Sequence, residues 1–244
     1  MKTETSCNKC KTPNEKFLEY YFCRKCNEES QKKRMEEIYQ DQVRDAEQQE
    51  ADRFNNRFKQ INIGPRFKDS TFENYTPEND EAKKVLKFCT VYAEKFDKVL
   101  EKGAGILMVG SCGTGKNHLA SAIAMNILDK GYTPIQTTAI KLVRRIKATW
   151  ARDSSEDEQE VIGSFTEPDL LIIDEVGVQF GSKTEELLIT EIINNRYEER
   201  KPTILISNET IESLEKIIGF RAIDRFHEDG SRVLVFNWSS YRRK

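Results

Sequence analysis

The chain has no excess of charge of one sign. Its 244 residues include 39 lysines and arginines against 41 aspartates and glutamates, for a net charge of −2. This excludes a protein that coats nucleic acid through a global positive field, so any such contact must come from a local patch. Long hydrophobic runs are also missing, since the apolar stretches at 106–109 and 170–173 are far shorter than the roughly 18 residues of a membrane helix.

The start of the chain lacks an apolar signal region, so we expect a cytoplasmic protein without membrane contact. Apolar residues are few, at 37%, and charged residues are many, at 33%. A chain of this length can still bury a core, which predicts one ordered domain with a polar appendage. Residues 28–59 contain no glycine or proline and only a narrow apolar stripe, which predicts a charged, solvated helix over about 27–62.

Cysteine is unevenly distributed along the chain. Two Cys-x2-Cys pairs lie near the start and enclose 12 residues; their members are Cys7, Cys10, Cys23 and Cys26. Such a doubled pair predicts a zinc ribbon with four thiolate ligands, because each tight turn can present two sulfurs to one Zn²⁺ ion. The four thiolates would fill all coordination positions, so the ion would be structural and would supply folding energy to a small segment. Four unrelated buried thiols or a redox pair are the alternatives.

From about residue 66 onward, short apolar segments alternate with amphipathic ones. Strands are expected at 105–109, 133–138, 170–173, 203–207 and 232–236. Helices are expected at about 79–101, 116–130, 139–152, 184–199 and 210–217, and the acidic stretch 153–159 is expected to be a loop. Apolar strands separated by helices are typical of a parallel sheet covered on both faces. The sequence therefore predicts an α/β domain with a five-stranded parallel sheet at 66–244, a zinc ribbon at 1–30 and a charged linker helix at 31–65.

A glycine-rich loop follows the first of these strands and opens a helix, which is the context of a phosphate-binding loop. Its glycines let backbone amides turn toward phosphates, and Lys116 would reach the β- and γ-phosphates. Asn117 replaces the usual Ser or Thr ligand of Mg²⁺; its amide oxygen can still bind the ion, and we infer slow or conditional hydrolysis. His118 suits packing or capping better than binding. The residues assigned to this site are Gly110, Ser111, Cys112, Gly113, Thr114, Gly115, Lys116, Asn117 and His118.

A second apolar strand ends in two acids. Because it follows a phosphate-binding loop by about 60 residues, it predicts that Asp174 lies near Mg²⁺ and Glu175 near the attacking water. A third strand ends at Asn208, which could orient water or contact the γ-phosphate. Asn208 could equally cap the helix that follows it.

Four separated segments, at 72–75, 113–120, 173–179 and 236–242, resemble the DnaC family of replicative helicase loaders, which are AAA+ P-loop NTPases. The resemblance covers roughly residues 66–244 and includes the unusual Asn117, whereas the first 65 residues differ from the best-known bacterial loader. It implies an ATPase that uses ATP and Mg²⁺ and delivers a replicative hexameric DNA helicase onto single-stranded DNA. Our leading hypothesis is that the ribbon and charged helix bind the helicase, and that ATP binding and hydrolysis control assembly and release.

The resemblance also implies roles for individual residues. Lys116 and Asn117 match the first nucleotide motif, Asp174 and Glu175 the second, Asn208 the first sensor, Arg225 the arginine finger and Arg242 the second sensor. An arginine finger reaches a neighbour's γ-phosphate only if copies of the chain associate head to tail. Arg221 is a rival for the finger, and either arginine could be ordinary surface charge.

The family's contact with single-stranded DNA corresponds here to a basic cluster of Lys141, Arg144, Arg145 and Lys147. A solvated helix face is the alternative for this cluster. Trp150, which follows it, could stack on a base but would more commonly belong to a core.

Three other functions compete with a helicase loader. One is a transposition helper ATPase that acts with a transposase on duplex DNA. Another is a small-molecule P-loop kinase, and the last is a zinc adaptor that binds nucleotide without hydrolysing it.

Overall fold

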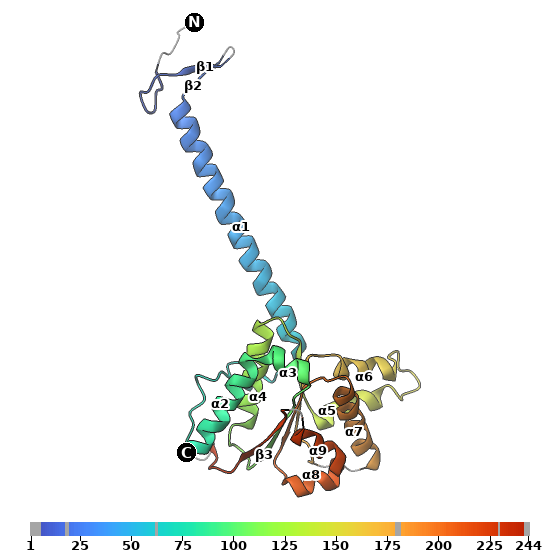
Figure 1. Ribbon diagram of the computed structural model, residues 1–244. Helices are drawn as coiled ribbons and strands as arrows, with labels where there is room; N and C mark the ends of the chain where they lie inside the picture. Colours follow the sequence, from blue (N-terminus) through green and yellow to red (C-terminus); the bar gives the residue numbers. More distant parts are fainter. Residues whose placement is uncertain (1–5, 18–19, 62, 179–181, 229, 242–244) are drawn as a thin grey trace. The chain divides into compact units, whose positions relative to one another are not determined.

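The computed structural model describes residues 6–17, 20–61, 63–178, 182–228 and 230–241 (Figure 1). The chain forms two compact units, Met1–Asn55 and Asn56–Lys244. Among the described residues, no helix is both long enough and apolar enough to cross a membrane.

The first unit contains a short antiparallel ribbon and most of a long helix. Strands β1 (Glu15–Phe17) and β2 (Tyr20–Phe22) pair with each other, and helix α1 (Arg24–Ile61) follows. The sequence predicted that this helix begins at about residue 27, whereas it begins at Arg24. The second cysteine pair lies at its first turn, where the backbone N–H of Cys26 lies 3.5 Å from Cys23 Sγ. The apolar stripe of α1 faces solvent, since Met35 is 65% and Tyr39 is 60% exposed.

The second unit contains a five-stranded sheet in the order β4-β5-β6-β3-β7. Every neighbouring pair of these strands is parallel, which confirms the predicted sheet. In parallel strands the carboxyl ends meet at one edge, so the segments that follow β3, β5 and β6 come together. The strands are β3 (Ile106–Gly110), β4 (Pro134–Thr138), β5 (Leu170–Asp174), β6 (Thr203–Ser207) and β7 (Arg232–Phe236).

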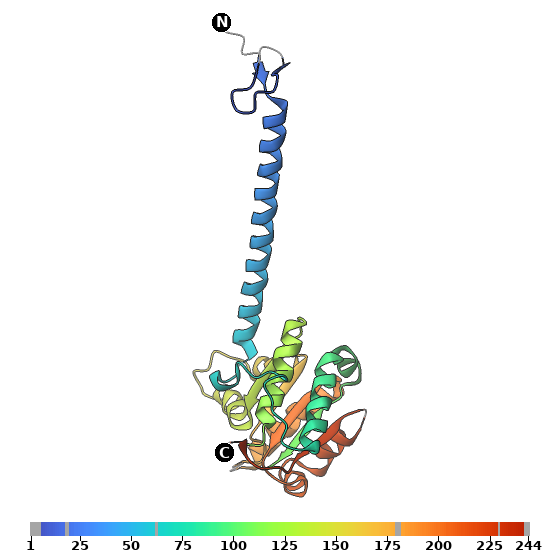
Figure 2. The same ribbon diagram turned by 90° about the vertical axis from the view of Figure 1, so that its left-hand side faces the viewer.

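Helices cover both faces of this sheet. Leu107, Ile173 and Leu205 belong to one buried cluster with apolar residues of the helices α5 to α9. Because side chains alternate along a strand, their neighbours Ile106 and Ile204 point to the opposite face, where α4 contacts the strands. Figure 2 looks onto that second face and shows α2 and α4 side by side in front of the strands.

Most of these helices begin and end near the predicted positions. Two were not predicted: α6, which begins where Asp157 accepts a hydrogen bond from the N–H of Gln159 at 2.8 Å, and the short α9. The helices are α4 (Lys116–Asp129), α5 (Ala139–Ala148), α6 (Glu158–Thr166), α7 (Lys183–Glu198), α8 (Ile211–Ile218) and α9 (Phe220–Asp224), with 3-10 turns η1 (Pro65–Phe67) and η2 (Arg225–His227).

The helix predicted at 79–101 is two helices, α2 (Asp80–Glu94) and α3 (Phe96–Lys102). Lys130 explains the break, because its ammonium donates hydrogen bonds to the carbonyl oxygens of Ala93 at 2.6 Å and Glu94 at 2.9 Å. These carbonyls at the end of α2 are thereby satisfied outside the helix. The break lets Phe96 turn into the core, where it is fully buried.

Candidate nucleotide-binding site and metal centre

The glycine-rich loop connects β3 to α4. Gly110 and Gly115 have φ angles of 132° and 92°, which disfavour any other residue. A Cβ atom on Gly110 would overlap the backbone of Phe236, and one on Gly115 would lie 2.5 Å from Cε2 of Tyr75. The N-cap residue of α4 is Gly115, which has no side chain to cap the helix. A loop of this form can receive phosphate oxygens.

Lys116, the first residue of α4, is nearly buried. Its ammonium donates hydrogen bonds to the carbonyl oxygens of Gly110 at 2.6 Å and Ser111 at 2.8 Å. The side chain therefore folds back over the loop that it would serve. An incoming phosphate would replace these carbonyls as the partner of the ammonium.

Asn117 faces the carboxylate of Asp174. Its side-chain Nδ2 donates to Asp174 Oδ2 at 2.7 Å, and the N–H of Glu175 donates to Asp174 Oδ1 at 2.7 Å. Burial raises the pKa of Asp174, and the Asn117 and Glu175 hydrogen bonds and the Lys116 charge partly oppose this rise. Asn117 Oδ1 is buried without a hydrogen-bond partner among the described residues. An unpaired amide oxygen beside a carboxylate fits a hard cation such as Mg²⁺.

Glu175 and Asn208 extend from adjacent strands toward the same opening. Glu175 is exposed and adopts a left-handed backbone with a φ of 58°, which turns the chain sharply after β5. The turn is tied to β6, because Val176 N–H donates to Ile206 O at 3.0 Å. Asn208 is not a helix cap: Thr210 occupies that position of α8, and its hydroxyl accepts from Ser213 N–H at 3.2 Å.

A cavity of about 450 Å³ joins these residues. This volume is in the range of small-molecule sites. It brings together side chains that lie far apart in the sequence and that we predicted to act together, namely Lys116, Asn117, Asp174, Glu175 and Asn208.

Sequence reasoning gave no role to several other residues of the cavity. They come from the segment before α2 and from the end of the chain, and they are Arg66, Phe67, Ser70, Asn74, Tyr75, Thr76 and Tyr241. The two segments meet over the loop, since the Tyr241 hydroxyl donates to Thr76 O at 2.6 Å and Tyr241 N–H to Gly113 O at 2.9 Å. The motifs at 72–75 and 236–242 were the available signal, although they did not reveal this contact.

His118 packs where the sequence suggested it would. Its Nε2 lies 2.8 Å from the carbonyl oxygen of Thr71, and its ring contacts that of Tyr75. The histidine thus fastens the segment before α2 onto the start of α4.

Neither candidate for the arginine finger, Arg225 or Arg221, lines this cavity. Arg225 lies in η2, where its guanidinium contacts the ring of Tyr197 on α7. Arg221 on α9 is exposed, and no described residue forms a hydrogen bond or ion pair with it. Arg242 lies outside the described residues.

The basic cluster lies on α5. Lys141, Arg144 and Arg145 are exposed, and the neighbouring Trp150 is 49% exposed, so it is not a core residue. Two of the four cations are paired with acids. Arg145 forms an ion pair with Glu156 of the acidic stretch, and Lys147 forms one with Glu185 of α7 at 2.8 Å.

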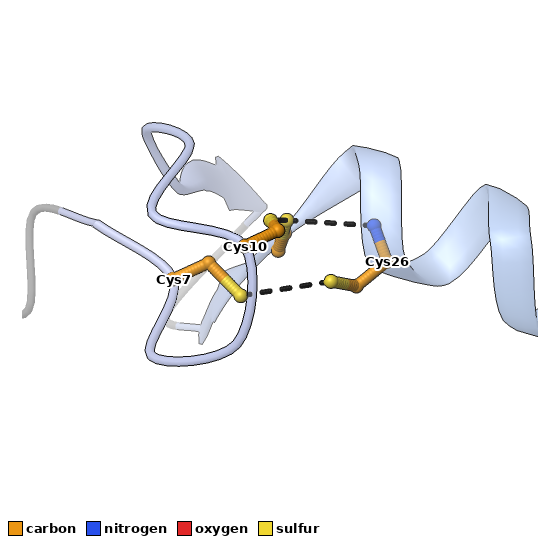
Figure 3. A group of neighbouring side chains, drawn as sticks. Cys7, Cys10 and Cys26 are labelled. Atoms are coloured by element: carbon orange, nitrogen blue, oxygen red, sulfur yellow. Dashed lines mark hydrogen bonds between the residues drawn. The ribbon is translucent and has the colours of Figure 1, made fainter.

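The four cysteines of the ribbon converge on one point. Their sulfurs all lie within 4.8 Å of one another, with Cys10 and Cys23 at 3.3 Å and Cys7 and Cys26 at 3.7 Å. Figure 3 shows Cys7 from the loop before β1 and Cys26 from α1 turned toward each other. Zn–S bonds of about 2.3 Å in a tetrahedron place sulfurs about 3.8 Å apart, so the cluster fits a four-thiolate zinc site.

Comparison with known proteins places this architecture in a family. The family of IstB-like ATP binding proteins matches residues 24–244. A protein of Escherichia coli K12 named replicative helicase loader DnaC is 34% identical over 187 residues, which cover 77% of this chain and 75% of that protein. A protein of the same name from Buchnera aphidicola (subspecies Baizongia pistaciae) is 36% identical over 174 residues, which cover 71% of this chain and 70% of that protein.

A solved structure agrees with the fold. The crystal structure of the DnaC helicase loader superimposes with a TM-score of 0.62 at 24% identity and covers 71% of this chain and 99% of that one. The sequence matches, the parallel sheet and the phosphate-binding loop lead to one conclusion: the chain belongs to the IstB/DnaC-like family of AAA+ ATP-binding proteins.

Proposed function

We propose that this protein is an ATP-dependent loader that binds the replicative hexameric DNA helicase and delivers it onto single-stranded DNA. The observation that carries the proposal is the cavity that joins Lys116, Asp174 and Glu175 in a chain whose relatives are named replicative helicase loaders. Those names favour a loader over a transposition helper, a metabolite kinase or a zinc adaptor.

ATP is the substrate of the proposed site. Lys116 would leave the carbonyls of Gly110 and Ser111 and bind the β- and γ-phosphates. Asn117 Oδ1 and the Asp174 carboxylate would hold Mg²⁺, which neutralises phosphate charge when it is bound. Glu175 would orient and deprotonate the attacking water, and Asn208 would contact that water or the γ-phosphate.

In this proposal, hydrolysis of ATP sets the time at which the loader is released and does not drive movement along DNA. Asn117 donates a hydrogen bond of 2.7 Å to Asp174, so Mg²⁺ would compete with this bond for the carboxylate. Arg225 lies outside its own chain's cavity and would complete the site of a neighbour in a head-to-tail assembly. Hydrolysis would then be slow in the isolated chain and faster in the assembly.

The remaining surfaces have separate tasks. The zinc ribbon and α1 would bind the helicase, because the exposed apolar stripe of α1 is available to a partner. The cations of α5, Lys141 and Arg144 above all, would bind the phosphates of single-stranded DNA, and exposed Trp150 would stack on a base.

The test mixes the full chain with a purified hexameric helicase, with and without ATP and Mg²⁺, and follows complex formation by size-exclusion chromatography with light scattering. We expect a stable complex with ATP, and we expect Lys116→Ala to abolish nucleotide binding while the zinc ribbon still contacts the helicase. Failure to bind any replicative helicase, together with ATP-dependent filaments on duplex DNA, would instead favour the transposition helper.

A further inference from the structure

Arg225 is held against α7 by contacts that the ATP cavity does not explain. The centre of its guanidinium lies 4.2 Å from the centroid of the Tyr197 ring. Its Nη1 donates a hydrogen bond to Asn194 Oδ1, one turn earlier on the same helix. Tyr197 is itself fixed, since its hydroxyl donates to Glu228 Oε2 at 2.8 Å. Two elements, α7 and the segment after η2, thus hold one arginine in one orientation.

This arrangement leaves most of the arginine's hydrogen-bonding capacity unused. A guanidinium has five N–H donors, and stacking on a ring occupies its face but none of its donors. In the described part of the chain, Asn194 is the one hydrogen-bond acceptor of the Arg225 guanidinium. The residue is half-buried, so part of it remains accessible to an acceptor from outside the molecule.

A nearby arginine shows that this restraint is specific. Arg221 lies one turn earlier on the same surface, is exposed and has no such contacts with the described residues. A long side chain loses rotamer freedom when it binds a phosphate, and a side chain that is already ordered loses less. Of these two arginines, the restrained one is therefore better prepared to bind an anion in a fixed geometry.

We infer that Tyr197 is a positioning residue that holds the Arg225 guanidinium ready for the γ-phosphate of a nucleotide bound to the neighbouring copy. The inference rests on the proposed function, because it requires the head-to-tail assembly. Glu228 supports it in a defined way: a carboxylate that accepts the phenol hydrogen bond makes the ring more electron-rich and strengthens its attraction for the cation.

The test measures ATP turnover of the full chain with a single-stranded oligonucleotide, using four variants. Tyr197→Leu removes the ring, Tyr197→Phe keeps it, Arg225→Ala removes the proposed finger, and Glu175→Gln blocks hydrolysis but keeps the finger. Because Tyr197 is 40% exposed, these replacements are expected to leave the fold intact, which circular dichroism checks. We expect kcat to fall about fivefold in Tyr197→Leu with unchanged KM, and to recover in part in Tyr197→Phe, which keeps the ring but loses the hydrogen bond to Glu228.

Mixing variants separates a role in the neighbour's site from a structural role. In a mixed assembly, a Tyr197→Leu chain supplies an active site with intact Glu175, and a neighbouring Glu175→Gln chain supplies Arg225 held by intact Tyr197. Turnover of the mixture should therefore exceed the sum of the separate rates. A structural role in its own chain would give no such gain. The parallel mixture of Arg225→Ala and Glu175→Gln tests the finger itself. If that mixture shows no gain, the head-to-tail proposal fails and the inference fails with it; if it gains and the Tyr197→Leu mixture does not, only the inference fails.

Discussion

Trp238 donates its indole N–H to the carbonyl oxygen of Thr114 at 3.0 Å, across 124 residues of sequence. The Tyr75 hydroxyl donates to the same oxygen at 3.3 Å. Thr114 is fully buried in the middle of the phosphate-binding loop. Two segments outside the loop, one before α2 and one after β7, therefore hold the loop in place, and its shape depends on both.

Removing either brace should therefore loosen the loop. Trp238→Phe keeps an aromatic ring against Phe236, whose ring centroid lies 4.9 Å away, but loses the indole donor. Tyr75→Phe likewise keeps its ring and loses the hydroxyl donor. We expect each single variant to lower the free energy of unfolding by about 1 kcal/mol. The double variant should lose more than the sum, because the Thr114 carbonyl is then buried without a partner.

Urea unfolding followed by circular dichroism measures these free energies, and titration calorimetry with Mg-ATP reports whether the loop still binds. Strict additivity of the two single variants would show that the two donors do not share the Thr114 carbonyl. Tyr132→Phe is a suitable control, since that ring packs on Phe96 away from the loop.

The pairing of Asn117 with Asp174 gives a prediction with a defined pH dependence. Asn117→Asp replaces a hydrogen-bond donor with a carboxylate beside one whose pKa is already raised by burial. Two adjacent carboxylates raise each other's pKa values further, and we expect a loss of about 1–3 kcal/mol of stability while both are ionised. As the pH falls through these raised pKa values, one carboxyl takes up a proton, the repulsion disappears and the loss should shrink.

Thermal unfolding at a series of pH values checks this, with Gln159→Glu as the control that adds the same charge at an exposed position of α6. Mg²⁺ should also stabilise Asn117→Asp more than the wild-type chain, because two carboxylates then face the ion. A deficit that is independent of both pH and Mg²⁺ would mean that residue 117 does not sense the charge on Asp174.

The sequence predicted local features well because local chemistry determines them. Continuous apolar residues define β3, β5 and β6, and the glycines of the loop are required by its backbone angles. Parallel pairing then brings Lys116, Asp174 and Asn208 to one edge, as expected, since their places at strand ends follow from the order of the elements.

Contacts between side chains from distant segments could not be predicted in this way. The break between α2 and α3 depends on Lys130, which is remote in sequence from the carbonyls that it satisfies. Likewise, no pattern within 139–152 indicates that Glu156 would pair with Arg145, or that α6 would begin directly after the acidic stretch. Periodicity and caps describe one element at a time, whereas these contacts require the packed fold.

The ion pair of Arg145 with Glu156 predicts that the acidic stretch competes with DNA. Glu156 lowers the positive charge that α5 presents, and its own pKa is lowered by the hydrogen bond to Arg145, so it is ionised at neutral pH. We expect Glu156→Gln to bind a single-stranded oligonucleotide about threefold more tightly, with a difference that fades as salt rises.

Asp153→Asn makes the same charge change in the same segment and should have a smaller effect. Fluorescence anisotropy with a labelled oligonucleotide distinguishes the two, and equal effects would reduce the ion pair to a general contribution of net charge.

The ribbon provides the last prediction, which concerns metal removal. A small segment held by four sulfurs within 4.8 Å has little apolar core of its own, so bound Zn²⁺ should supply most of its folding free energy. We expect about one zinc per purified chain by elemental mass spectrometry, and nearly none in Cys7→Ser, which leaves three thiolates. Cys112→Ser should keep its zinc, because that exposed thiol lies in the phosphate-binding loop of the other unit.

Chelation should then expose residues 6–26 to proteolysis while Mg-ATP binding by the second unit persists, since the ATP cavity contains none of the four cysteines. Loss of zinc from both variants, or a ribbon that resists protease without metal, would show that the sulfurs are held together by something other than a shared ion.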